Sequence, residues 1–239
     1  MKNIWFYIRL AVVIGVVIFL YAFAMQKNNA RKISKINIEM NDETMPFITQ
    51  NVVNNLLIEN LKSGLNTPKE NLNLLSCENL LNKNPMIKKS QVYVSIDGVL
   101  QAKIEQRKPI ARFVQGYQSY YIDEEGKRMP LSDNFAARVP LVSGYMAEKH
   151  KDSTLLLFKS IKEDSFLEKN IVGIYIDNSG EIFLKNREDT FEIAFGKPIE
   201  IDKKLQNYKA FYQFAYQNNL LKNYKKITLA YTKQVIGIK

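Results

Sequence analysis

The chain has 239 residues, of which 46% are hydrophobic and 11% aromatic, so it suits one domain or two small ones and excludes disorder as the global state. Its single cysteine, Cys77, excludes an internal disulfide and any C-x-x-C metal or redox site. The formal net charge of +10 is compatible with nucleic acid, an anionic membrane surface or an acidic partner.

The N-terminal segment is the most apolar part of the chain. Apolar residues run from Ile4 to Met25, interrupted by Arg9, and cover the roughly 20 residues that a helix needs to cross a bilayer. Trp5 and Tyr21 suit the two membrane interfaces, and Arg9 is close enough to the N-terminal end to snorkel towards headgroups. We therefore predict a transmembrane helix over residues 1–25 with Trp5, Arg9 and Tyr21 as its anchors.

A cleavable signal peptide is the alternative for this segment, with Ala22-Phe23-Ala24 as its A-x-A cleavage site. We favour the uncleaved helix because the apolar run begins before Arg9 and is long enough to span a bilayer. Basic residues occur on both sides of the run, so charge alone does not set its orientation. The densest basic cluster follows it, in a predicted tether over residues 26–32, where lipid headgroups are the simplest partner.

Residues 33–108 have the pattern of a small mixed unit. Residues 32–40 alternate as in a strand, Thr49 can cap an amphipathic helix, and Ser76 can cap a shorter helix that must stop near Asn84-Pro85. Asp97-Gly98 is a strong hairpin signal between two alternating runs. The order strand–helix–helix–strand–strand predicts one sheet layer under two helices.

The second half, residues 109–239, is rich in predicted strands. Alternating residues predict strands near 120–122, 139–144, 172–176, 182–184, 191–195, 227–231 and 235–239, and a helical face is predicted from Leu155 to Ile161. The strand at residues 235–239 closes the chain, and we expect it to be a sheet edge. The predicted fold class is α+β.

An aromatic stripe occupies the predicted helix from Leu205 to Tyr216. Packing onto the neighbouring strands is the simpler use of these rings. A ligand-binding face is the alternative, and it would make the protein a membrane-anchored or secreted extracytoplasmic ligand-binding module.

The sequence contains no pattern that indicates catalysis. No G-x-G or G-x-S-x-G occurs, and the one histidine, His150, lies in a polar run that is typical of a solvated loop. The adjacent carboxylates at 123–125 and 163–164 are typical of turns and exposed helical faces. We therefore predict no enzyme activity, no cofactor or metal, no small-molecule substrate and no nucleic-acid partner.

Residues 33–239 resemble the FtsQ/DivIB family of bacterial cell-division proteins. The similarity rests on the order and spacing of four stretches: 84–113, which includes "QRKPIARF", 120–131 ("YYIDEEGKRMPL"), 139–144 ("VPLVSG") and 227–239 ("ITLAYTKQVIGIK"). The resemblance implies one transmembrane helix, a POTRA domain (33–108) and a β domain (109–239). It also implies that Arg107, Pro109 and Ala111 form the junction, where the last POTRA strand passes directly into the β domain.

The resemblance further implies a location and a partner class. The N-terminus would be cytoplasmic and the bulk periplasmic, at the division site of the inner membrane. Division proteins of the FtsB and FtsL type would bind by adding a strand to the C-terminal edge. The residues carried over to this interface are Tyr231, Val235, Ile236, Gly237, Ile238 and Lys239.

Overall fold

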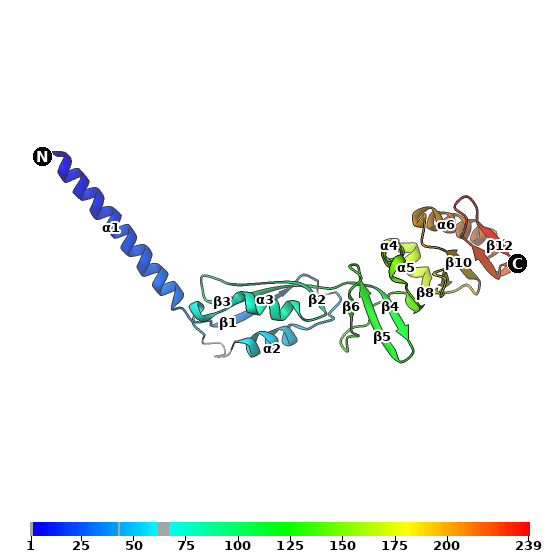
Figure 1. The fold of residues 1–239 in the computed structure, drawn as a ribbon, viewed down its shortest axis with the longest axis horizontal. Coiled ribbons are helices and arrows are strands. Elements are labelled where there is room, and N and C mark those ends of the chain that lie inside the picture. The colour runs from blue at the N-terminus through cyan, green and yellow to red at the C-terminus, as the bar shows by residue number, and fades with distance from the viewer. Residues whose placement is uncertain (1, 43, 62–66) are drawn as a thin grey trace. The chain divides into compact units, whose positions relative to one another are not determined.

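The computed structural model describes residues 2–42, 44–61 and 67–239, and its contacts divide the chain into two compact units, Met1–Gln106 and Arg107–Lys239 (Figure 1). The first unit contains the N-terminal helix and a small sheet with two helices. The second contains a large sheet and three further α-helices. The fold is therefore mixed α+β, as predicted.

In the first unit, a three-stranded sheet has the order β1-β3-β2, with β1 parallel and β2 antiparallel to the central β3. The elements follow one another in the predicted strand–helix–helix–strand–strand order. Their bounds are α1 (Lys2–Asn29), β1 (Lys35–Met40), α2 (Gln50–Asn60), the 3₁₀ turn η1 (Lys69–Asn71), α3 (Leu74–Asn82), β2 (Ile87–Val94) and β3 (Val99–Gln106).

Local capping explains where the two small helices begin. The Thr49 hydroxyl accepts a hydrogen bond from the Val52 N–H at 3.4 Å, which confirms the predicted cap of α2. The predicted cap of α3 is wrong: Asn73 occupies that position, and its side chain accepts from the Ser76 N–H at 2.9 Å. Asn73 immediately precedes the helix, so its amide oxygen reaches a free N–H of the first turn, whereas Ser76 already lies inside that turn.

In the second unit, nine strands form one sheet in the order β12-β11-β10-β9-β8-β7-β4-β5-β6. The strands are β4 (Pro109–Gln115), β5 (Gln118–Asp123), β6 (Arg128–Met129), β7 (Leu141–Gly144), β8 (Ile171–Ile176), β9 (Ile182–Asn186), β10 (Glu192–Gly196), β11 (Lys226–Thr228) and β12 (Ile236–Ile238). The helical elements are η2 (Glu148–His150), α4 (Lys151–Glu163), α5 (Ser165–Asn170), α6 (Ile201–Gln217) and η3 (Leu221–Asn223).

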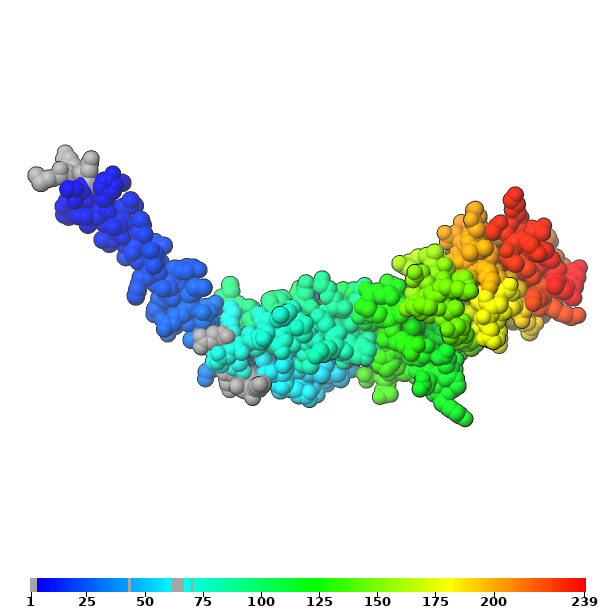
Figure 2. Space-filling view, in the orientation of Figure 1, coloured from blue at the N-terminus to red at the C-terminus, as the bar shows by residue number. Residues whose placement is uncertain are grey.

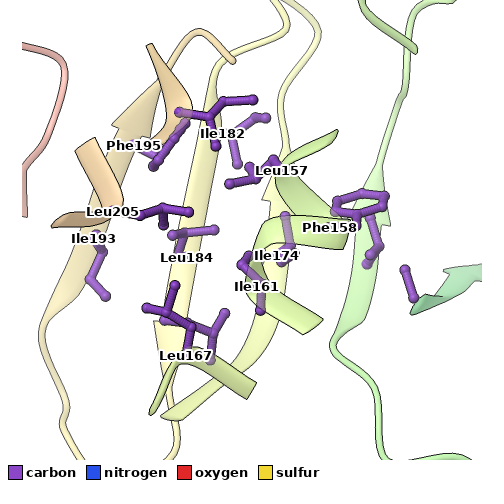
Figure 3. Close-up of a cluster of buried hydrophobic side chains, with 14 of the residues drawn as sticks. Leu157, Phe158, Ile161, Leu167, Ile174, Ile182, Leu184, Ile193, Phe195 and Leu205 are labelled. Carbon is purple, nitrogen blue, oxygen red and sulfur yellow. The ribbon is translucent and has the colours of Figure 1, made fainter. Parts of the chain in front are cut away.

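The core of the second unit lies between the helices and one face of the sheet. Leu157, Phe158 and Ile161 of α4 are fully buried and pack with Leu205 of α6 and Leu167 of α5 against the strands (Figure 3). Helices α4 and α6 therefore each bury one apolar stripe, as their sequence patterns predict. Helix α5 was not predicted; Asp164 begins it by accepting hydrogen bonds from the Phe166 and Leu167 N–H groups.

Candidate functional site

Helix α1 carries the residues predicted to anchor the chain. Among the described residues, it is the one helix long and apolar enough to cross a membrane, over Ile4–Asn29, with a mean hydropathy of 2.5. The Arg9 guanidinium carbon lies 5.1 Å from the centroid of the Trp5 ring, and Tyr21 is exposed. Cation–π contact is one way to hold an arginine beside an interfacial ring.

At the predicted junction, neighbouring residues are fixed in different units. The Gln106 side chain donates to the Asp42 carbonyl at 2.9 Å and accepts from the Ile48 N–H at 3.1 Å, both in the first unit. The Arg107 guanidinium donates to Asp123 at 2.6 Å and to Glu125 at 3.0 Å, both in the second. Strand β3 ends at Gln106 and β4 begins at Pro109, so a direct strand-to-strand connection joins the units.

The surroundings of Arg107, Pro109 and Ala111 explain why the junction contains these residue types. Burial disfavours the charged form of Arg107, but its hydrogen bonds to Asp123 and Glu125 outweigh burial and raise its pKa. Pro109 stands opposite Asp123 at a register irregularity that ends at Ala111, where a missing N–H is tolerated. Ala111 is fully buried, so a larger side chain has no room there.

At the C-terminus, β12 forms one edge of the nine-stranded sheet. Among the described residues, it pairs with β11 alone, antiparallel, with Gly237 opposite Ile227 and Ile236 opposite Thr228. These last residues lie at the molecular surface, in red (Figure 2). The observed strand is shorter than the predicted 235–239, because Val235 turns inward and packs against the core while Lys239 lies beyond the last pair.

On the face of the nine-stranded sheet that the helices cover, the buried row ends in β12 at Gly237, where a side chain would clash with a neighbouring ring. Cross-strand registers align one buried row across the sheet: Phe113, Val142, Ile174, Leu184, Ile193 and Ile227, ending at Gly237. A Cβ added at Gly237 would lie 2.5 Å from Cε1 of Tyr224, so the Tyr224 ring occupies the place of that side chain. Phe211 of α6 packs edge-on against the same ring, with centroids 5.2 Å apart.

The other face of β12 carries exposed apolar side chains. Ile236 and Ile238 are 40% and 52% exposed, and in the antiparallel pair they share a face with Thr228 and Lys226. Tyr231, in the turn before β12, is 55% exposed. Tyr231, Ile236 and Ile238 thus face solvent. Val235 faces the core, and so would a side chain at Gly237.

The remaining sheet edges are less suited to receive a strand. Along β2, the Ser90 N–H already donates to Asn82 at 2.9 Å and the Val92 N–H to Glu78 at 2.7 Å, so α3 side chains occupy that edge. Strand β1 carries Lys35 and Glu39, and charged side chains discourage edge pairing. The fourth edge, β6, has two residues.

Side chains of helix α6 hold the C-terminal edge of the sheet through hydrogen bonds. Asn207 donates to the Thr232 carbonyl at 3.0 Å, which holds the turn between β11 and β12. The buried Lys204 ammonium donates to the Phe195 and Lys197 carbonyls at 3.0 and 2.8 Å, and burial lowers the pKa of Lys204. Sequence reasoning missed Lys204 and Tyr224, because neither a lysine in a helix nor a tyrosine before a strand signals its contacts.

The aromatic stripe of α6 is a packing surface except at its end, where Tyr216 is 67% exposed. Leu205, Tyr208 and Ala215 are buried, and Phe211 and Tyr212 pack against the core. The Tyr208 hydroxyl donates to Asn186 at 2.8 Å, and burial raises the pKa of Tyr208. A hollow of about 890 Å³ in this unit is lined by Leu141, Ser143 and residues 172–175 and 183–192, outside α6. No group of three or more His, Cys, Asp or Glu side chains suited to a metal occurs within residues 2–42, 44–61 and 67–239.

Comparison with known protein families gives a match for each of the two units. Residues 108–237 match the family described as FtsQ/DivIB, C-terminal related, and residues 31–105 match the POTRA-like domain. No curated protein matches the chain. The first match covers more than half of the chain and extends into β12, and the POTRA-like match precedes it in the order that the sequence predicted. The chain therefore belongs to the FtsQ/DivIB family of membrane-anchored cell-division scaffolds.

Proposed function

We propose that this protein is a non-enzymatic bitopic scaffold that recruits partner division proteins by β-strand addition at β12. The observation that carries the proposal is the position of β12: it forms one edge of the nine-stranded sheet, in a unit that matches the FtsQ/DivIB family. An edge strand presents unpaired N–H and C=O groups, which are a template for another chain. The partners would be division proteins of the FtsB and FtsL type.

In this proposal, α1 spans the inner membrane with its N-terminus in the cytoplasm, and both units lie in the periplasm at the division site. The length and hydropathy of α1 support the membrane span, and the family supports a place at the division site. A fluorescent fusion should form a mid-cell ring in dividing cells. Uniform envelope fluorescence would count against a division role. The side of the membrane is tested separately with a cysteine placed at the fully exposed Tyr117. A labelling reagent that does not cross the membrane should modify this cysteine in intact spheroplasts.

Strand addition alone provides modest affinity, because each main-chain hydrogen bond contributes only about 0.5–1.5 kcal/mol net. Specificity must come from side chains on the added strand. On the open face, the strand would lie beside Ile236 and Ile238, so we expect apolar residues at alternate positions there. Tyr231 would add an amphipathic anchor of a type that is enriched at interfaces.

The test is deletion of Val235 to Lys239 in the full-length protein, with binding to the cognate division partner measured in detergent or nanodiscs. We expect the deletion to abolish binding, and Ile238→Asp to weaken it while leaving the fold intact by circular dichroism. Tyr117→Asp, on the exposed β4–β5 turn, is the matched surface control. Binding of the deletion variant at wild-type affinity would refute edge-strand docking.

A further inference from the structure

One end of the first unit is fastened to the chain as it leaves α1. The Ser34 N–H donates to the Gly98 carbonyl at 3.0 Å, the Ile33 N–H to Thr67 at 3.1 Å, and the Lys69 N–H to the Arg31 carbonyl at 2.9 Å. The Arg31 side chain donates to the Ile96 carbonyl. The β2–β3 turn and η1 are therefore both held against residues 31–34.

Close packing adds to these hydrogen bonds. Gly98 has φ of +80°, and a Cβ there would lie 2.8 Å from the Lys32 carbonyl oxygen and 3.4 Å from Arg31 side-chain carbons. The Lys69 ammonium also donates to the Asn28 side chain in the last turn of α1, at 3.5 Å. A flexible tether would make none of these contacts, so this end of the unit stays near the end of α1.

The position of α1 in a membrane then sets how far this end of the first unit lies from the apolar core of the bilayer. The apolar run stops at Met25, and the helix continues to Asn29, about 6 Å further along its axis. The polar layer on each side of a bilayer is roughly 5–8 Å thick. Residue 30 therefore leaves α1 in the outer part of the headgroup layer, and residues 31–34, with the turns bound to them, lie at its surface.

The side chains at this end suit an anionic bilayer surface. Ile96, at the tip of the β2–β3 turn, is 81% exposed, so its apolar side chain is free to contact the acyl-chain boundary of a bilayer. Five basic residues belong to the last turn of α1, to residues 30–35 or to η1: Lys27, Arg31, Lys32, Lys35 and Lys69. The acids of the same segments are Asp97 in the turn and Glu70 in η1. Basic residues next to a membrane span attract anionic lipids.

We propose that the end of the POTRA-like unit formed by residues 95–98, η1 and residues 30–35 is a membrane-surface docking face for anionic phospholipid headgroups, with Ile96 inserted among them. The inference rests on α1 crossing a membrane and does not depend on β12 binding a partner. The connection to α1 brings the face to the surface, and the lysines select anionic lipid.

The test uses the full-length protein in nanodiscs with an environment-sensitive label on Ile96→Cys; the native Cys77 is buried and remains unlabelled. Lipids carry the same headgroup quencher on phosphatidylcholine or on phosphatidylglycerol. Val52→Cys, exposed on α2 at the Gln106 end of the unit, is the matched control. Val17→Cys, with an acyl-chain quencher, checks that α1 is in the bilayer.

We expect quenching at residue 96 but not at 52, and stronger quenching by the anionic lipid. Substituting Lys27, Lys32 and Lys35 with Gln should lower that preference by up to about fivefold per lysine, while contact at 96 persists. Substituting Lys83, Lys88 and Lys89, at the opposite end, should change nothing. Equal quenching by both lipids would overturn the lipid selectivity, and no quenching at 96 would overturn the docking face. Absence of quenching at 17 would overturn the membrane anchor and this inference with it, while leaving strand addition at β12 standing.

Discussion

Gly237→Ala offers a sharp test of how β12 is held. The added Cβ would lie 2.5 Å from Cε1 and 2.7 Å from Cδ1 of Tyr224, whereas ordinary contacts begin at 3.4 Å. Either the ring or the strand must therefore move by about 0.9 Å, the difference between 3.4 and 2.5 Å. The ring is packed against Phe211, so we expect the three-residue strand to yield.

The magnitude follows from the cost of overpacking, which is about 1–3 kcal/mol. Such a cost is comparable to the few net hydrogen bonds that hold β12 and smaller than the stability of a domain, so the strand should open locally. In the full-length protein in micelles, hydrogen exchange of residues 225–239 should accelerate about 5- to 150-fold, the range that 1–3 kcal/mol implies. Exchange in β9 should be unchanged.

A second substitution provides the control. In a Gly237→Ala background, Tyr224→Ala removes the clashing ring. Hydrogen exchange in β12 should therefore be slower in the double variant than the sum of the two single-variant effects predicts. Partner binding should follow the same order as strand protection. An exchange rate at residues 225–239 that stays at the wild-type value in Gly237→Ala would refute the close packing of Tyr224 on β12. Additive effects on exchange in the double variant would refute a direct contact between residues 224 and 237.

Three further predictions concern the frame that supports the site. Arg107→Ala leaves the buried Asp123 carboxylate without its charged partner, with the Glu125 and Lys127 N–H groups still donating to it, and should destabilise the second unit by about 3–5 kcal/mol in urea unfolding, whereas an effect below 1 kcal/mol would contradict the buried ion pair. Lys204→Met removes the buried donor to the Phe195 and Lys197 carbonyls, of which the Lys197 carbonyl still accepts from the Ile199 N–H, and should cost about 1–3 kcal/mol in the same assay; unchanged stability would contradict those bonds. Burial raises the pKa of Asp164, but hydrogen bonds from Lys209 and the first turn of α5 outweigh burial and hold it below its usual value. The stabilisation is therefore present above the usual pKa of about 3.9 and is lost as pH falls through the lowered value. Asp164→Asn should be less stable at neutral pH and show a flatter loss of stability in acid; an unchanged acid limb would refute this role.

Local patterns predicted most of the elements. Alternation located the meander β8–β10, Asp97-Gly98 located the hairpin between β2 and β3, and a predicted edge strand at the C-terminus is confirmed at the edge of the sheet. These features depend on side-chain period and turn chemistry, which are properties of short segments. Ile236 and Ile238 entered the candidate site through the family resemblance, and the structure shows which face of β12 they occupy.

Strand order could not be predicted in this way. Strand β7 lies parallel between β4 and β8, and β11 pairs parallel with β10 across the crossover through α6. Parallel partners are distant in sequence, and no local signal names them. Likewise, the inward turn of Val235 and the place of Tyr224 over Gly237 depend on how α6 packs, which alternation within the last five residues does not encode.

The central claim is that β12 receives a strand from a division partner. The most direct measurement is hydrogen exchange of residues 225–239 in the full-length protein, with and without a purified partner of the FtsB or FtsL type. The account predicts slower exchange of the β12 amides on binding, with Ile238→Asp reducing both the binding and the protection. A partner that binds while exchange in β12 stays unchanged would contradict it.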